Sequence, residues 1–230
     1  MRLLFIRHGE PDYVHDCLTP LGRAQAEAAA RRLAGEGITT IYSSPNGRAR
    51  ETAACTAKQF GLPVVILPWM HEISWGGDGV PENGHPWTLG DWMLRDGFDW
   101  YHADWRDHPY FRNNTATACY DMIAKELDAL MAEHGYVRDG RRFLCERENR
   151  ENIALFSHGG SGACVLSQLL NLPFPYVSSV LPYDFTSVII LDFPSAPGEY
   201  IFPRLDLFND HAHIAKTGGP LLQQEPDQNS

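Results

Sequence analysis

The sequence is short of basic residues, of long apolar runs and of paired cysteines, and each shortage excludes a class of protein. Lys and Arg number 19 against 29 Asp and Glu, so the formal net charge is −10. This acidic balance argues against nucleic-acid or anionic-membrane partners, because both require a basic face. No apolar run approaches the roughly 20 residues that a membrane span needs. The apolar start at 1–6 meets Arg7 at once, so we expect no secretory signal.

The cysteines are too few and too scattered to form a disulfide framework. There are five of them, with no C-x-x-C pair, at Cys17, Cys55, Cys119, Cys145 and Cys164. An odd, dispersed set in a chain of 230 residues indicates reduced thiols. We therefore expect a cytoplasmic protein; the sequence carries no signal for an oligomeric state.

The first third of the chain alternates short apolar strands with helices. Thr19-Pro20 and Ser44-Pro45 both supply helix-start signals, a capping hydroxyl followed by proline in the first turn. This βαβαβ rhythm predicts a parallel sheet. The expected elements are strand 3–6, helix 19–33, strand 39–42, helix 44–60 and strand 64–67.

The middle of the chain breaks this rhythm. All six tryptophans fall within 69–115, a stretch also rich in Gly, Pro and Asp, which we interpret as an inserted cap. Its aromatic residues favour a small core of its own, or alternatively an apolar lid over the leaving group of a substrate. After it we expect helix 117–134, a solvated connection at 138–151, strand 153–156, helix 160–170, strands 186–193 and 200–207, and a disordered tail at 217–230.

These elements predict one α/β domain over 1–230. Its fold class is a three-layer αβα sandwich with a mainly parallel sheet and an inserted aromatic-rich cap. In such a sheet, ligands bind at the carboxyl ends of the strands.

Four predicted strand ends carry polar residues suited to an anion. They are followed by Arg7-His8, by Ser43-Ser44 and then Arg48, by His71-Glu72, and by His158-Gly159. Converging guanidiniums and imidazoles would repel one another unless an anion lay between them. Arg48 and Gly159 also fall at helix starts, where free N–H groups favour a phosphate. The pattern predicts a phosphate site; no metal-ligand spacing accompanies it, so we expect no metal and no cofactor.

These motifs resemble the histidine phosphatase superfamily, which has the phosphoglycerate-mutase-like fold. The resemblance rests on four ordered segments: Arg7-His8-Gly9-Glu10 with Leu18-Thr19-x-x-Gly22, Ser43-Ser44-Pro45-x-x-Arg48, Met70-His71-Glu72, and Ser157-His158-Gly159-Gly160. It implies that His8 becomes a phosphohistidine and that Glu72 protonates the leaving alcohol. It also implies that Arg7, Arg48 and His158, with Gly159, hold the phosphoryl group.

The chain departs from the family pattern at several positions. Pro11 stands where Ser or Thr is usual, and Val14 where Asn is common. The Trp-Glu-Gly run often found after Glu72 is missing, which leaves Asp78 and Glu82 as substitute proton donors. These departures lie in the regions that would contact the substrate.

The function expected from the resemblance is metal-independent hydrolysis of a small phosphate ester. A phosphoglycerate-mutase-type phosphomutase is the alternative enzyme, and a non-catalytic phospholigand-binding module is the alternative outside catalysis. A mutase needs extra basic residues to rebind its intermediate, and the insertion offers only Arg95, Arg106 and Arg112.

Two further patterns have simpler interpretations. Cys17-x5-Arg23 fits the bare signature of cysteine-dependent phosphatases, but Pro20 removes a backbone donor from the required cradle. His211 and His213 could face one side of a strand as a metal pair, yet nothing nearby completes a site. We interpret both as structural.

Overall fold

The computed structural model describes residues 1–216, and the predicted disordered tail at 217–230 lies outside the described residues. The strands are β1 (Arg2–Arg7), β2 (Pro11–Asp12), β3 (Cys17–Leu18), β4 (Thr40–Ser43), β5 (Val64–Ile66), β6 (Tyr136–Asp139), β7 (Arg142–Cys145), β8 (Asn152–Ser157), β9 (Val188–Asp192), β10 (Tyr200–Ile201) and β11 (Arg204–Asp210). The α-helices are α1 (Pro20–Leu33), α2 (Gly47–Phe60), α3 (Pro86–Arg95), α4 (Thr115–Glu133), α5 (Gly159–Leu170) and α6 (Phe174–Val180).

Six strands form the central sheet, in the order β11-β9-β1-β8-β4-β5. β8 pairs in parallel with both β1 and β4, and β4 pairs in parallel with β5. Only β9 runs the other way, since it is antiparallel to both of its neighbours, β1 and β11. The predicted fold class, α/β with a mainly parallel sheet, is confirmed.

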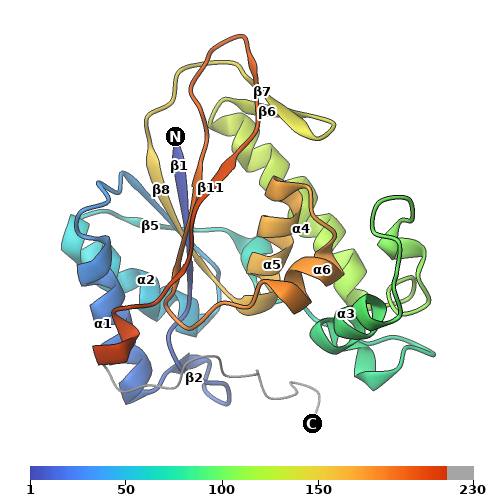
Figure 1. The fold of residues 1–230 in the computed structure, drawn as a ribbon. Helices are drawn as coiled ribbons and strands as arrows, with labels where there is room; N and C mark the ends of the chain where they lie inside the picture. The colour runs from blue at the N-terminus through green and yellow to red at the C-terminus, as the bar shows by residue number, and fades with distance from the viewer. Residues whose placement is uncertain (217–230) are drawn as a thin grey trace.

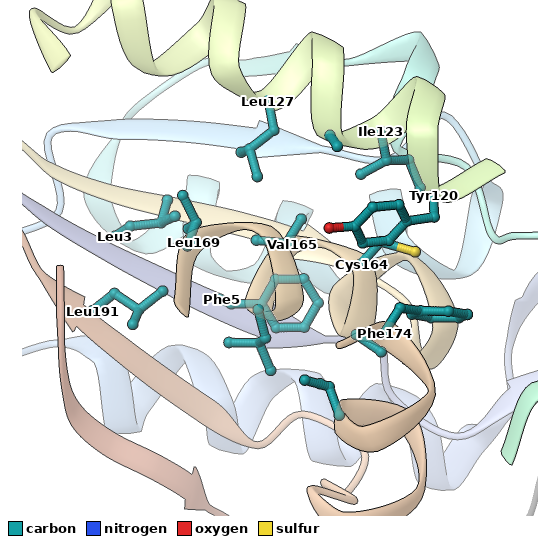
Figure 2. Packing of buried hydrophobic residues seen from close by; sticks show 14 of the residues in the cluster. Leu3, Phe5, Tyr120, Ile123, Leu127, Cys164, Val165, Leu169, Phe174 and Leu191 are labelled. Atoms are coloured by element: carbon teal, nitrogen blue, oxygen red, sulfur yellow. The ribbon is translucent and has the colours of Figure 1, made fainter. Parts of the chain in front are cut away.

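Helices cover both faces of this sheet, which makes three layers (Figure 1). α1 and α2 lie on one side, and α4, α5 and α6 lie on the other. β1 is buried on both faces, so its alternate residues enter different cores: Leu4 and Ile6 pack on the α1–α2 side, whereas Leu3 and Phe5 join the larger cluster. Figure 2 shows this larger cluster between β1, α4 and α5.

The insertion at 69–115 contains α3 and several short 3₁₀ turns. Its buried Trp105 packs edge-on against Phe111 and Tyr120, with ring centroids 5.4 and 5.3 Å away, and lies 5.8 Å from Phe174 of α6. The aromatic residues therefore extend the main core against α4 and α6, and do not form the separate small core that the sequence predicted. A cap over the leaving group stays a prediction.

The expectation of a solvated connection at 138–151 is wrong. β6 and β7 form an antiparallel hairpin there, and β10 adds a third strand. Arg138 is not free in solvent: its Nε donates to Asp128 Oδ1 at 2.7 Å, and its guanidinium lies 4.3 Å from the Phe143 ring centroid. Charged side chains whose stems cover aromatic residues mimic a solvated segment in sequence.

Other boundaries shift by a few residues. The predicted strand 200–207 is two strands, because β10 pairs with β7 while β11 joins the central sheet. The second helix begins at Gly47, with Asn46 rather than Ser44 at its N-cap. Within residues 1–216, no helix combines the length and the apolar character needed to cross a membrane.

Candidate active site

Three polar side chains meet at the carboxyl ends of adjacent parallel strands. His8 follows β1, His158 follows β8, and Arg48 lies in the first turn of α2 after β4. Because β8 lies between β1 and β4, the sheet order brings these ends together. The two imidazole centroids are 5.2 Å apart, and Arg48 Nε lies 3.3 Å from His8 Nε2. All three side chains are buried.

The hydrogen bonds of His8 define its tautomer. Nδ1 lies 2.7 Å from the carbonyl oxygen of Gly9, which can only accept, so Nδ1 carries the proton. Nε2 then keeps its lone pair and accepts the N–H of Arg48 Nε. Burial, followed by the charges of Arg7 and Arg48, holds the pKa of His8 well below its usual range. His8 is therefore an uncharged imidazole whose Nε2 lone pair faces a cation.

Arg7 is anchored from the segment before β9. Its Nη1 donates to the carbonyl of Tyr183 at 2.8 Å, and its guanidinium lies 4.4 Å from the ring centroid of Phe185. The same ring lies 5.5 Å from the His8 imidazole. Sequence reasoning missed Phe185, because a phenylalanine before an apolar strand has no signal that separates it from the core.

Arg48 is held by the short β2–β3 hairpin. Asp16 accepts from Arg48 Nη1 at 2.6 Å through Oδ1 and from the backbone N–H of Gly47 at 2.7 Å through Oδ2. The Tyr13 ring lies 5.3 Å from the guanidinium carbon. Gly47 is needed for this approach, because a Cβ there would lie 2.0 Å from the carbonyl oxygen of Asp16. Sequence reasoning missed both Asp16 and Tyr13.

His158 is paired with a serine at the end of the neighbouring strand. Its Nε2 lies 2.7 Å from Ser44 Oγ, while its Nδ1 is buried without a hydrogen-bond partner in the described part of the chain. Burial, then the charges of His8, Arg48 and Arg7, lowers the pKa of His158 well below its usual value. A buried Nδ1 without a partner is a position where a ligand oxygen would be bound.

The Glu72 carboxylate contacts the first turn of α5, although Glu72 itself belongs to the insertion. Its Oε1 accepts from the N–H groups of Ile73 at 2.9 Å and Ser161 at 2.8 Å, and its Oε2 accepts from Gly160 at 3.2 Å. A Cβ on Gly160 would lie 2.7 Å from Oε1, so glycine permits this contact. Gly159 is the first residue of α5. These bonds place the carboxylate beside the helix that follows His158.

The alternative donors lie elsewhere on the insertion. Asp78 and Glu82 are both exposed, whereas Glu72 is buried. The geometry therefore favours Glu72 as the acid associated with this cluster.

The two secondary patterns occupy other environments. Arg23 Nε lies 3.8 Å from Glu51 of α2, on the surface, and Cys17 is part of the two-residue strand β3 rather than of a loop that cradles phosphate. His211 Nδ1 lies 3.1 Å from Asp184 Oδ2, and His213 Nε2 lies 3.1 Å from Thr186 Oγ1. Over residues 1–216, no cluster of three or more His, Cys, Asp or Glu side chains could hold a metal ion.

A family model supplies the classification that this geometry suggests. The model of the histidine phosphatase superfamily (branch 1) matches residues 3–200. The chain belongs to this superfamily, which confirms the resemblance carried by its four motifs.

Curated relatives fall into phosphatases and probable mutases. Putative phosphoserine phosphatase 2 of Hydrogenobacter thermophilus is 32% identical over 97 residues, 38% of this chain and 46% of that protein. A probable phosphoglycerate mutase of Yersinia enterocolitica is 33% identical over 85 residues, 33% of this chain and 40% of that protein. The chain thus spans less than half the length of these two relatives. Glucosyl-3-phosphoglycerate phosphatase of Mycobacterium tuberculosis is 26% identical over 93% of this chain and 96% of its own length.

A solved structure agrees with the longest of these alignments. Native mycobacterial glucosyl-3-phosphoglycerate phosphatase superposes with a TM-score of 0.62 and 26% identity, covering 90% of this chain and 98% of that one.

Proposed function

We propose that this chain is a phosphomonoesterase that acts through a phosphohistidine on His8. One observation carries the proposal: His8 is buried, its Nδ1 is bound to a carbonyl oxygen and its Nε2 lies against Arg48. Membership of the superfamily and its phosphatase-named members, one aligned over nearly the whole chain, support hydrolysis.

The reaction has two displacements at phosphorus. His8 Nε2 forms a bond to the phosphorus atom of the ester while the ester oxygen departs and takes a proton from Glu72. The Glu72 carboxylate then removes a proton from water as the water oxygen attacks the phosphohistidine. The P–N bond breaks, neutral His8 is restored and inorganic phosphate leaves.

The remaining polar groups hold the phosphoryl oxygens. We assign Arg7 and Arg48 as guanidinium donors, His158 as a donor through Nδ1, and Gly159 as part of the helix start that faces the anion. For Nδ1 of His158 to donate, its Nε2 must accept a hydrogen bond from the Ser44 hydroxyl, whose Oγ lies 2.7 Å away. Charge stabilisation of a loose transition state by such fixed donors supplies most of the catalysis in phosphoryl transfer.

Hydrolysis of p-nitrophenyl phosphate with EDTA present tests the proposal. We expect wild-type turnover to survive the chelator and to vanish in His8→Ala. The matched control is His102→Ala, since His102 is an exposed histidine of the insertion (83% of its side chain is accessible). Full activity in His8→Ala would overturn the proposal.

The same experiment separates the other two functions. Conversion of 3-phosphoglycerate to 2-phosphoglycerate with negligible hydrolysis would indicate a mutase, which the family membership also allows. Phosphate binding without turnover of any ester would indicate a binding module. The three arginines of the insertion disfavour the mutase, because each is already bound to a nearby oxygen: Arg95 to Asp91, Arg106 to Asp121 and Arg112 to the carbonyl of Asp107.

We also propose the setting in which the enzyme works. The substrate is a small phosphorylated molecule rather than nucleic acid or a membrane, in keeping with the negative net charge. The 69–115 insertion is a cap within a single domain. A cytoplasmic location fits five cysteines that are all free.

A further inference from the structure

The β2–β3 hairpin brings a carboxylate to the guanidinium that faces the nucleophile. Arg48 contacts His8 through Nε and Asp16 through Nη1, so a single guanidinium separates the Asp16 carboxylate from His8. The side chain of Asp16 is 41% exposed, whereas that of Arg48 is 6% exposed. The carboxylate therefore lies at the outer, solvent-facing end of the arginine.

Asp16 is held in this position by its own backbone and by α2. Its φ of 48° is in the left-handed region, and its Oδ2 accepts from the N–H of Gly47 at the start of α2. Although partial burial opposes it, the bonds from Gly47 and Arg48 keep the pKa of Asp16 below its ordinary value. Asp16 is thus a negative charge held in a fixed position beside Arg48.

This carboxylate occupies the positions to which a second anionic group of a substrate would bind. Nη1 of Arg48 and the Gly47 N–H are the donors that would otherwise bind a substrate carboxylate next to the phosphoryl group. Both are already satisfied by Asp16. A second negative charge would meet Asp16 instead of a cation.

The insertion offers no compensating charge. Between residues 69 and 115 the sequence has no lysine and only three arginines. Each of those guanidiniums is bound to an oxygen of Asp91, Asp121 or Asp107, as described above.

We propose that Asp16 is a specificity-determining residue that directs the enzyme to phosphate monoesters whose leaving group carries no negative charge. This inference rests on the proposed phosphatase activity and narrows its substrate class. Asp16 acts on the reaction in two ways, by holding Arg48 and by repelling a second anion.

Two esters that differ only in that charge test the inference. Glycerol 3-phosphate and 3-phosphoglycerate share a three-carbon frame, with a hydroxymethyl group in one and a carboxylate in the other. At pH 8, where ordinary imidazoles are neutral, we expect wild-type kcat/KM to favour glycerol 3-phosphate by about tenfold, the size of a partly screened charge repulsion.

The variant Asp16→Asn keeps the shape and removes the charge. Asparagine tolerates the left-handed backbone of this position. We expect the preference between the two esters to shrink by at least about threefold. The matched control is Asp12→Asn on the same hairpin, whose carboxylate is engaged with His15 rather than with Arg48, and it should keep the wild-type preference.

A second measurement needs no variant and covers the case in which Asp16→Asn loses activity by displacing Arg48. Raising the ionic strength screens the repulsion. The wild-type preference should therefore shrink between roughly 0.02 and 0.5 M KCl, because the Debye length falls from ~20 to ~4 Å over this range. Turnover of both esters with a preference that neither salt nor Asp16→Asn changes overturns the role of Asp16 alone. No turnover of any ester, p-nitrophenyl phosphate included, overturns the phosphatase activity and this inference with it.

Discussion

The carboxyl edge of the sheet and the insertion bury different side chains, and the difference separates function from stability. At the edge, His8, His158 and Arg48 are buried polar groups that lie close to one another, and burial, together with the arginine charge, lowers the pKa of both histidines. In the insertion, Trp105 and Phe111 are buried among other aromatic rings. The first arrangement favours the binding of an anion, whereas the second stabilises the fold with or without a ligand.

Among these variants, we expect truncation of Trp105 in the aromatic cluster to reduce stability the most. Trp105→Ala should lower the free energy of unfolding by about 3–5 kcal/mol, because the cavity lies against α4 and α6. Tyr101→Ala, at a side chain that is 92% exposed, should change it by less than about 0.5 kcal/mol. Urea denaturation measures both; similar losses in the two variants would break the comparison.

Removing a pocket guanidinium should act on rate. Arg48→Ala should lower kcat/KM for p-nitrophenyl phosphate by about 10²–10³-fold, the usual cost of one transition-state donor. Arg50→Ala, two residues further along the same helix and exposed, should stay within twofold of wild type, on the order of an ordinary surface substitution. Equal losses in both would mean that charge on α2, rather than contact, matters.

A single methyl group tests the position of Glu72. Gly160→Ala would place a Cβ 2.7 Å from Glu72 Oε1 and 2.4 Å from Ile73 Cγ1, so the carboxylate must move. We expect kcat to fall by about 10²-fold, as for an acid displaced by about 1 Å. The control Gly35→Ala has open space at its Cβ. Unchanged kcat in Gly160→Ala would argue against Glu72 as the proton donor.

The smallest expected effect is a pH dependence of stability. The folded-state pKa values of His8 and His158 lie well below 6.5, so the unfolded chain binds more protons than the folded chain as the pH falls. The free energy of unfolding should therefore fall as the pH drops below 6.5, by up to about 1.4 kcal/mol per pH unit for each histidine. His8→Asn should flatten this slope in denaturation curves between pH 7 and 5.5. An unchanged slope would show that His8 does not contribute.

Sequence patterns predicted those parts of the molecule whose positions follow from strand ends. The βαβ rhythm and the polar residues after β1, β4 and β8 were enough to bring His8, Arg48 and His158 to one edge, because parallel strands align their carboxyl ends. Each of these side chains is placed by the backbone next to it.

Residues that lie in turns and contact the site from there had no sequence signal of this kind. Asp16 depends on a left-handed backbone and on Gly47, and Phe185 depends on how the chain enters β9. The three-stranded sheet of β6, β7 and β10 was missed for a related reason, since β7 pairs with β10, which lies far along the chain. Local patterns do not encode contacts between distant segments.

In the proposed reaction the phosphoryl group passes through His8, so a trapped phosphoenzyme should carry it on that residue. Wild-type protein mixed with p-nitrophenyl phosphate would be quenched in base, digested and mapped by mass spectrometry, with His8→Asn as the control. We expect an acid-labile phosphoryl group on the peptide that contains His8, and none in the variant. A phosphoryl group on Cys17 or on another side chain would contradict the account.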